Sequence, residues 1–320
     1  MEEIFAPIKE EMLIVEQQYH NIVSQNKIMA AYCQEKNEAK MFRPAIVLLT
    51  AGLCGKITSK TQSISLIVEM LHNSSLIHDD VIDNGQKRRN KKTINALYGN
   101  QLAVLIGDYI LSKTMKQIAN LDDSYILQEI SHVSEAMIYG ELLQLEHKNQ
   151  KEQISIHQYL DVITNKTAIL LASCFKLGAY SAEVSAQQLQ EWYQMGLSFG
   201  IAFQIADDIS DYDINNIANK DANKDILEHK ITLPLITALQ NMTTHQQKEF
   251  LMFYFQHNGT RDEIEKIVHQ VIDNKGIDNA IHIMNAKAQV FSNFLKNFPN
   301  NNYRHALSEM LKKIVNVKAK

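Results

Sequence analysis

Residues His72–Asn95 read HNSSLIHDDVIDNGQKRRNKKTIN, an apolar helical pattern that arrives at three carboxylates, Asp79, Asp80 and Asp83. Because successive helical residues turn by about 100° around the axis, Asp79 and Asp83 share one face, with His72 on nearly the same stripe. Like charges at this spacing oppose a helix unless something neutralises them. A hard dication would neutralise them, and Mg²⁺ is the usual one where phosphates are also bound.

A run of cations follows the acidic residues directly, and it consists of Lys87, Arg88, Arg89, Lys91 and Lys92. These cations would face the anionic partner of the metal. Taken alone, the acidic residues could be a solvated helix face that ends in the turn Asn84-Gly85. The cations alone could be a surface loop or a nucleic-acid patch. Each of these ordinary interpretations is favoured until a second copy of the acidic pattern is considered.

The second copy is Phe203–Asp213, which reads FQIADDISDYD. Asp207 and Asp211 repeat the pair spaced by four residues, and Asp208 stands beside them. Gln204 falls on the same helix face as the pair. Two DDxxD helices far apart in the sequence predict two walls of one metal-filled cleft.

With both motifs in view, the chain resembles the trans-isoprenyl diphosphate synthases of the polyprenyl synthetase family. The family's first motif, DDxxD followed by an Arg pair, matches Asp79–Asp83 and Arg88-Arg89. Its second motif, FQxxDDxxD, matches Phe203–Asp211. Further matches cover essentially the whole chain and include Gly99–Ser112, Lys166-Thr167 and His229–Ile236.

The composition also predicts a helical protein. The chain has 320 residues with 45% hydrophobic side chains, enough for a large core. Its 11 Gly and 4 Pro are few, and few helix breakers indicate long helices. No composition shift marks a linker. The predicted fold is all-α, a single large helical bundle with a central cleft of the isoprenoid synthase type, forming one polyprenyl synthetase-like domain over residues 1–320.

Several features predict a cytoplasmic protein. No stretch reaches the roughly 18 apolar residues of a membrane span. The acidic N-terminus lacks the cationic start of a signal peptide. The cysteines Cys33, Cys54 and Cys174 have no paired spacing, which favours reduced thiols. The formal net charge of −4 argues against a nucleic-acid partner.

The resemblance implies a reaction and its residues. Isopentenyl diphosphate would be condensed head to tail onto an allylic diphosphate with Mg²⁺ as cofactor. The metal ligands would be Asp79, Asp83, Asp207 and Asp211, and the catalytic residues Asp79, Asp80, Asp83, Lys166, Asp207 and Asp208. Isopentenyl diphosphate would be held by Lys40, Arg43, His72 and Arg89. Arg88, Lys166 and Lys220 would place positive charge on the allylic diphosphate, and Thr167 and Gln204 would also bind substrate.

The isopentenyl diphosphate site departs from the family pattern. Two glycines usually precede the lysine, whereas Glu38 and Ala39 precede Lys40 here, and Met41 replaces a usual arginine. A negative Glu38 near a diphosphate is unfavourable unless it points away. Lys40 and Arg43 could instead be a solvated helix entrance.

Local patterns predict the remaining elements. Residues 3–26 have the pattern of one amphipathic helix, and residues 61–76 that of an apolar helix leading into the first motif. Residues 214–225 are polar and are expected to form a mobile lid that excludes water. Asp122-Asp123 is expected to be a turn and an N-cap. Gly140 and Gln144 match a helix that lines the family's cleft.

Product length is expected to depend on the helix before Asp79. Short-product relatives carry a bulky aromatic residue five positions before DDxxD, where this chain has the small Ser74, with Ser75 beside it. Leu71 would be the next barrier and Tyr139 the floor of the tunnel. A helical turn of about 5.4 Å matches about one isoprene unit, so each turn of this helix would gate about one added unit. The family resemblance implies a product of roughly six to ten units. The two serines could instead merely permit close helix packing.

Other interpretations stay open. A short-chain farnesyl or geranylgeranyl diphosphate synthase has the same motifs. A non-catalytic subunit of a heteromeric synthase would lose them, and a terpene cyclase or squalene-type synthase would not need Lys40, Arg43 and Arg89. The resemblance also implies a homodimer, with peripheral membrane contact when the product is released.

Overall fold

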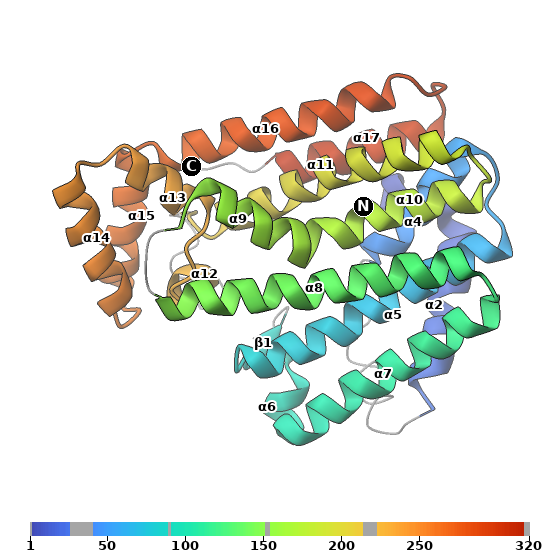
Figure 1. Cartoon of the computed structure of the whole chain (residues 1–320), viewed down its shortest axis with the longest axis horizontal. Coiled ribbons are helices and arrows are strands. Elements are labelled where there is room, and N and C mark those ends of the chain that lie inside the picture. Colours follow the sequence, from blue (N-terminus) through green and yellow to red (C-terminus); the bar gives the residue numbers. More distant parts are fainter. Residues whose placement is uncertain (1, 26–40, 89–90, 151–153, 214–222, 317–320) are drawn as a thin grey trace. The chain divides into compact units, whose positions relative to one another are not determined.

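The computed structural model describes residues 2–25, 41–88, 91–150, 154–213 and 223–316 (Figure 1). Its helices are α1 (Glu2–Phe5), α2 (Lys9–Val23), α4 (Phe42–Cys54), α5 (Ser59–Ile82), α6 (Ile94–Tyr98), α7 (Asn100–Leu121), α8 (Ser124–Gln150), α9 (Ile156–Ile163), α10 (Ile169–Ser181), α11 (Ala186–Ser210), α12 (Lys224–Leu227), α13 (Leu233–Gln240), α14 (Thr244–Gln256), α15 (Arg261–Asp273), α16 (Gly276–Leu295) and α17 (Asn302–Val315). Strands β1 (Lys87–Arg88) and β2 (Lys91–Lys92) form a short ribbon. The prediction of an all-α fold is confirmed. Within the described ranges, no helix is long and apolar enough to cross a membrane.

The chain divides into two compact units. The first contains Met1–Ser134, Ser173–Tyr193 and Pro299–Leu307. The second contains Glu135–Ala172, Gln194–Phe298 and Ser308–Lys320. Four of the five boundaries fall inside α8, α10, α11 and α17, and the fifth, between Phe298 and Pro299, lies between α16 and α17. The single domain over residues 1–320 and its central cleft stay predictions.

In the first unit, α5 packs against α4 and α7 (Figure 1). A capping box between Thr58 and Thr61 begins α5, so its first free N–H groups are satisfied. Close approach of α5 to α7 depends on Gly107, because a Cβ there would overlap the ring of His78. The Ser74 hydroxyl donates to the Gly107 carbonyl at 2.9 Å and joins the same two helices. This packing fixes the helix that carries the first aspartate motif.

The N-terminal segment corrects one prediction. The expected single helix over residues 3–26 is interrupted by a 3₁₀ turn, Ala6–Ile8, and α2 begins only at Lys9. Pro7 lies in this turn, where its missing N–H and fixed φ suit a helix start better than a helix interior. The buried stripe continues through the turn, with Ile8, Met12 and Val15 all buried.

In the second unit, α13, α15 and α16 pack together. Gly276 begins α16 and approaches the backbone of α13, so that the Thr237 hydroxyl donates to the Gly276 carbonyl at 2.8 Å. Phe199 of α11 packs on Phe291 of α16 with ring centroids 5.0 Å apart. These contacts anchor α11, the helix at whose end the second aspartate motif lies.

Candidate active site

The first motif lies at the C-terminal end of α5. Asp79 and Asp80 are in its last turn, and Asp83 is the C-cap residue. The helix stops because Asn84 adopts a left-handed conformation with φ of 50°. The Gly85 N–H then donates to the Asp80 carbonyl at 2.9 Å and the Asn84 N–H to the Val81 carbonyl at 3.3 Å, which is a Schellman motif. The turn expected at Asn84-Gly85 is confirmed.

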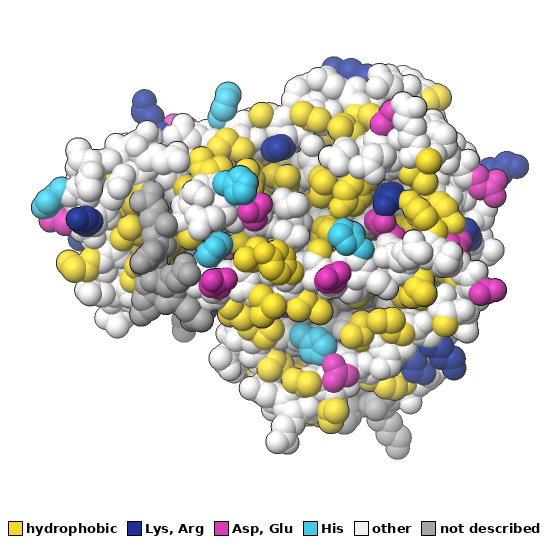
Figure 2. Space-filling model, in the orientation of Figure 1, with side chains coloured by type: hydrophobic (Ala, Val, Ile, Leu, Met, Phe, Trp, Pro, Cys, Tyr) yellow, Lys and Arg dark blue, Asp and Glu magenta, His cyan; other side chains and the backbone are white. Residues whose placement is uncertain are grey.

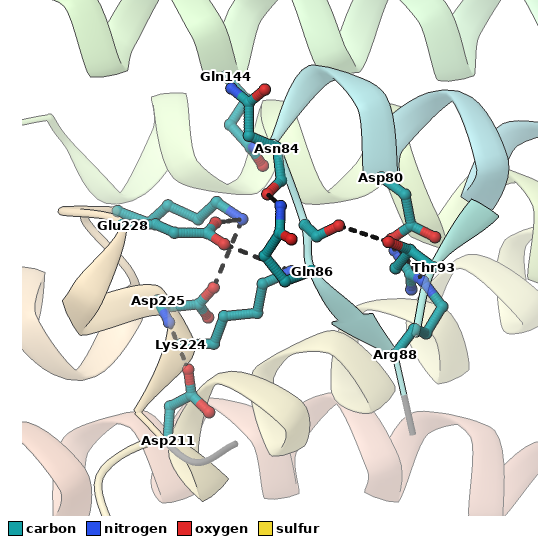
Figure 3. A network of polar contacts seen from close by, with 12 residues as sticks. Asp80, Asn84, Gln86, Arg88, Thr93, Gln144, Asp211, Lys224, Asp225 and Glu228 are labelled. Carbon is teal, nitrogen blue, oxygen red and sulfur yellow. Dashed lines mark hydrogen bonds and ion pairs between the residues drawn. The ribbon is translucent and has the colours of Figure 1, made fainter. Parts of the chain in front are cut away.

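The cation run beyond this turn folds back on the motif. Lys87 pairs with Lys92 and Arg88 with Lys91 in the ribbon. The Arg88 guanidinium donates to Asp80 Oδ1 from Nε at 2.9 Å and from a terminal nitrogen at 2.8 Å (Figure 3). Arg88 is thereby fixed beside the acidic residues.

Two polar side chains after the ribbon hold the turn in place. The Thr93 hydroxyl donates to the Gly85 carbonyl at 2.6 Å (Figure 3). The Asn95 amide donates to the carbonyls of Asp80 and Gly85 at 3.0 and 3.1 Å. The backbone of the first motif is therefore fixed from both sides of the turn.

The aspartates of the first motif differ in accessibility. Asp80 is only 4% exposed, whereas Asp79, Asp83 and His72 are partly accessible. The middle aspartate is thus a buried partner of Arg88, and the outer pair is partly accessible to solvent.

The second motif begins on the last turns of α11. Asp207 is exposed, Asp208 is 3% exposed, and Asp211 directly follows the helix end at Ser210. The Tyr159 hydroxyl donates to Asp208 Oδ2 at 2.6 Å, and the Gln204 amide donates to Oδ1 at 2.8 Å. As in the first motif, the middle aspartate is buried and fully bonded while the outer pair stays accessible.

A fourth acid, Asp225, belongs to this cluster. Its backbone N–H donates to Asp211 Oδ2 at 2.7 Å (Figure 3). Desolvation by the surrounding atoms, followed by the Asp225 charge, raises the pKa of Asp207 to about 6 and the pKa of Asp211 to about 7. The same two causes raise the pKa of Asp208 well above its usual range. Lys230, 3.7 Å from Asp225, compensates only part of this negative charge.

Lys166 and Thr167 lie in a single π-helical turn, Thr164–Ala168, between α9 and α10. The Thr167 hydroxyl donates to Gln204 Oε1 at 2.9 Å, which links the turn to Asp208 through Gln204. Lys166 Nζ donates to Gln144 Oε1 at 3.2 Å and forms an ion pair with Glu141. A π-helical turn inside a helix often marks a functional site.

The other predicted site residues have mixed outcomes. Lys40, Arg89 and Lys220 lie outside the described residues, as do Glu38, Ala39 and residues 214–222 of the expected lid. Arg43, in the first turn of α4, is half-buried. Their substrate-binding roles stay predictions.

The residues proposed to control product length have different environments. Ser74 is 2% exposed and its hydroxyl donates to the Gly107 carbonyl, and its role in product length stays a prediction. Ser75 donates to the His72 carbonyl at 2.9 Å, and Leu71 is buried. Tyr139 is 54% exposed, and its role as the floor of a tunnel stays a prediction.

Three polar residues of the site were missed in the sequence. Tyr159 and Glu141 lie 49 and 25 residues from the partners they contact, and no local pattern connects these positions. Asp225 could have been found from its position at the end of the polar segment that follows the second motif. Asp123 was correctly expected to cap α8, since its Oδ1 accepts from the N–H groups of Tyr125 and Ile126.

Comparison with known proteins gives this site its class. The sequence profile of the polyprenyl synthetase family matches residues 25–271. The chain therefore belongs to the polyprenyl synthetase family, and it is a prenyltransferase of the kind that condenses isopentenyl diphosphate head to tail with an allylic diphosphate.

Individual relatives cover nearly the whole chain. The all-trans-nonaprenyl-diphosphate synthase (geranyl-diphosphate specific) of Rhodobacter capsulatus is 30% identical over 318 residues, covering 96% of this chain and 94% of that protein. A polyprenyl synthase from Caulobacter crescentus, solved with calcium and isoprenyl diphosphate, superposes with a TM-score of 0.90 at 27% identity and covers 100% of this chain and 97% of its own.

Short-product relatives share the fold as well. A geranylgeranyl pyrophosphate synthetase from Pyrococcus horikoshii Ot3 has a TM-score of 0.89 at 25% identity, covering 99% of each chain. The fold alone therefore does not determine product length, and particular side chains must do so.

Proposed function

We propose that this chain makes a long-chain all-trans polyprenyl diphosphate, with Mg²⁺ held by Asp79, Asp83, Asp207 and Asp211. The observation that carries the proposal is common to both motifs. In each, the middle aspartate is buried and bonded, while the outer aspartates remain accessible. Long product length is supported by the nonaprenyl-diphosphate synthase relative and by the small Ser74 and Ser75.

The carboxylates fit a hard dication. Within the described part of the chain, no three His, Cys, Asp or Glu side chains converge on one metal position. Each motif instead offers a carboxylate pair. Mg²⁺ binds in this way, through one or two carboxylates, substrate phosphates and water. The raised pKa values of Asp207 and Asp211 also fit, because a dication would relieve the repulsion that now favours protons.

The chain's own residues would prepare ionisation of the allylic substrate. A carbon–oxygen bond must break, leaving an allylic cation and a diphosphate. Bound Mg²⁺ would supply electrostatic stabilisation of the leaving oxygens. Arg88 and Lys166 would add fixed positive charge there, and Thr167 and Gln204 would orient the surrounding backbone. Lys220, which lies outside the described residues, would reach the same diphosphate.

The second substrate needs its own site. Lys40, Arg43, His72 and Arg89 would hold isopentenyl diphosphate so that its double bond faces the cation. Positioning of this kind is what distinguishes elongation from cyclisation, which uses one diphosphate only.

The test is diphosphate release by the purified chain with farnesyl or geranyl diphosphate. We expect release only when isopentenyl diphosphate and Mg²⁺ are both present. Release from the allylic substrate alone would instead indicate a terpene cyclase. Absence of release until a partner protein is added would indicate a non-catalytic subunit of a heteromeric synthase.

The proposed enzyme is a homodimer. Apolar side chains are exposed along α6 and α7 of the first unit, and Figure 2 shows side chains of this kind on one face of the molecule. On α7 they include Val104, Leu105 and Met115, with Leu105 64% exposed. Exposed apolar groups on one element fit a second copy better than water. Light scattering should give twice the chain mass, and Leu105→Glu should reduce it to one chain.

The proposed compartment is the cytoplasm, with membrane contact limited to product release. A long polyprenyl chain is too apolar to leave into water. Product release should therefore accelerate when phospholipid vesicles are added, while the protein itself stays in the supernatant after the vesicles are sedimented.

A further inference from the structure

An ion pair in the second unit joins two segments that lie outside both aspartate motifs. Lys166 belongs to the π-helical turn Thr164–Ala168, and Glu141 lies on α8. The Lys166 ammonium has three N–H donors. In the described part of the chain, the ammonium forms an ion pair with Glu141 Oε2 and donates one N–H to Gln144 Oε1 at 3.2 Å. One donor is therefore left for an incoming anion.

The backbone around Lys166 is fixed as tightly as its side chain. A Cβ at Gly140 would lie 2.5 Å from the Lys166 nitrogen and 2.9 Å from its Cα, so only glycine admits this approach of α8 to the turn. The Ile169 N–H donates to the Thr164 carbonyl, five residues back, and closes the wide turn. Thr167 is bonded to Gln204 on the other side. The lysine thus projects from a backbone with little freedom to move.

Glu141 has an unusual environment for a carboxylate. The residue is only 8% exposed, and within the described residues neither of its carboxylate oxygens accepts a hydrogen bond, so its charge is compensated by the ion pair with Lys166. Burying an ionised carboxylate costs several kcal/mol, which one close cation compensates only in part. A purely structural pair could be replaced by apolar side chains at little cost. The free-energy cost of burying Glu141 is better explained if this carboxylate fixes the direction of the Lys166 ammonium.

We propose that Glu141 is a positioning residue that, together with Gln144, holds the Lys166 ammonium so that its third N–H faces the leaving diphosphate. The inference rests on the proposed function. As the carbon–oxygen bond of the allylic substrate breaks, negative charge grows on the diphosphate, and a donor already aimed at it needs no reorganisation. Glu141 itself neither touches the substrate nor exchanges a proton with it.

The test compares Glu141→Ala and Glu141→Gln, with Glu146→Gln as the matched control. Glu146 lies on the same helix in the same unit, and its side chain is exposed. Misplacing a catalytic group can cost about 100-fold, so Glu141→Ala should lower kcat by about that factor while the KM for farnesyl diphosphate changes little. Glu141→Gln keeps an acceptor and should recover about tenfold of this loss. The control should match the unmodified enzyme.

A double-variant cycle separates positioning from general loss of structure. Once Lys166 is replaced by alanine, adding Glu141→Ala should cause no further loss of kcat, because Glu141 acts only through Lys166. If Glu141→Ala does not fold, as judged by circular dichroism, Glu141→Gln is used in the same cycle.

Three outcomes would overturn the inference while leaving the proposed function intact. The first is an unchanged kcat in Glu141→Ala. The second is a loss of kcat in the double variant that equals the sum of the two single losses in free energy. The third is faster turnover with a lower KM in Glu141→Gln. The last would mean that Glu141 sequesters Lys166 instead of aiming it. An unmodified enzyme that is inactive with both diphosphates and Mg²⁺ would overturn the proposed function and this inference together.

Discussion

The two aspartate motifs share a sequence pattern but differ in how the buried middle aspartate is stabilised. Asp80 pairs with a full charge, Arg88, which lies only eight residues further along the chain. Asp208 accepts hydrogen bonds from two neutral groups, the Tyr159 hydroxyl and the Gln204 amide. The first motif therefore includes its own counter-charge, whereas the second retains excess negative charge and depends more on protons or a dication.

The largest expected effect is loss of an outer aspartate. Asp79→Ala and Asp207→Ala should each lower turnover by roughly three orders of magnitude or more, because each removes a ligand that acts in the transition state. Steady-state rates with saturating substrates and Mg²⁺ provide the measurement. Asp273→Ala, an exposed aspartate on α15, is the control and should be unchanged. Near-normal turnover in both motif variants would remove the basis for the metal sites.

The next largest effect is a difference in stability between variants that remove a partner of Asp80 and variants that remove a partner of Asp208. Arg88→Ala leaves the buried Asp80 charge unpaired and should lower the free energy of unfolding by about 3 kcal/mol. Tyr159→Phe removes one neutral donor from Asp208 and should cost only about 1 to 2 kcal/mol. Urea denaturation measures both. Equal losses would show that the motifs do not differ in the way proposed.

The adjacent arginines should divide between the substrates. Arg88→Ala should raise the KM for the allylic diphosphate about tenfold more than that for isopentenyl diphosphate, since a charged hydrogen bond is worth about 1.5 to 3 kcal/mol. Arg89→Ala should do the reverse. Initial rates with each substrate varied in turn provide the measurement, and identical ratios in the two variants would contradict the division of roles.

At Ser74 we expect a small effect on the rate of the first condensation but a large change in product length. Ser74→Phe places a ring between α5 and α7 and should shorten the product to roughly three or four isoprene units while leaving the first condensation intact. Ser74→Ala is the control, because it removes the bond to Gly107 without adding bulk. Unchanged product length in Ser74→Phe would mean that the growing chain does not pass this residue.

The smallest effect is the pH dependence of stability without metal. The folded pKa values of Asp207 and Asp211, about 6 and about 7, lie above the ordinary aspartate value of 3.8. The folded state therefore holds extra protons, and its stability should fall as the pH rises through about 6 to 7. Tm in EDTA should drop by a few degrees between about pH 5.5 and pH 8, and Mg²⁺ with diphosphate should restore it most at pH 8. In Asp211→Asn, Tm should fall less over this pH range. An equal fall in Tm in that variant would show that other groups cause the pH dependence.

Local patterns predicted much of the fold and of the acidic centre. The spacing of Asp79 and Asp83, the turn at Asn84-Gly85 and the N-cap at Asp123 depend on neighbours within a few residues, so the sequence contains the necessary information. The burial of Asp80 and Asp208 was not predictable, because an i, i+4 pattern does not say what packs beside the middle residue.

Contacts between distant segments account for the rest. The π-helical turn at Lys166 requires Gly140 from another helix, and the ion pair with Glu141 follows from that approach. The exposure of Tyr139 is likewise decided by packing and not by its position on an expected cleft helix. Contacts of this kind join residues far apart in the sequence, so no local pattern could have predicted them.

The most direct test of the central claim is the size of the product made by the purified chain from isopentenyl diphosphate and farnesyl diphosphate. Labelled products are converted to alcohols with phosphatase and separated by chain length, with and without Mg²⁺. We expect chains of roughly six to ten isoprene units that form only with Mg²⁺, because Ser74 stands where short-product relatives carry a bulky aromatic residue. Products that stop at three or four units, or products that form equally well in EDTA, would contradict it.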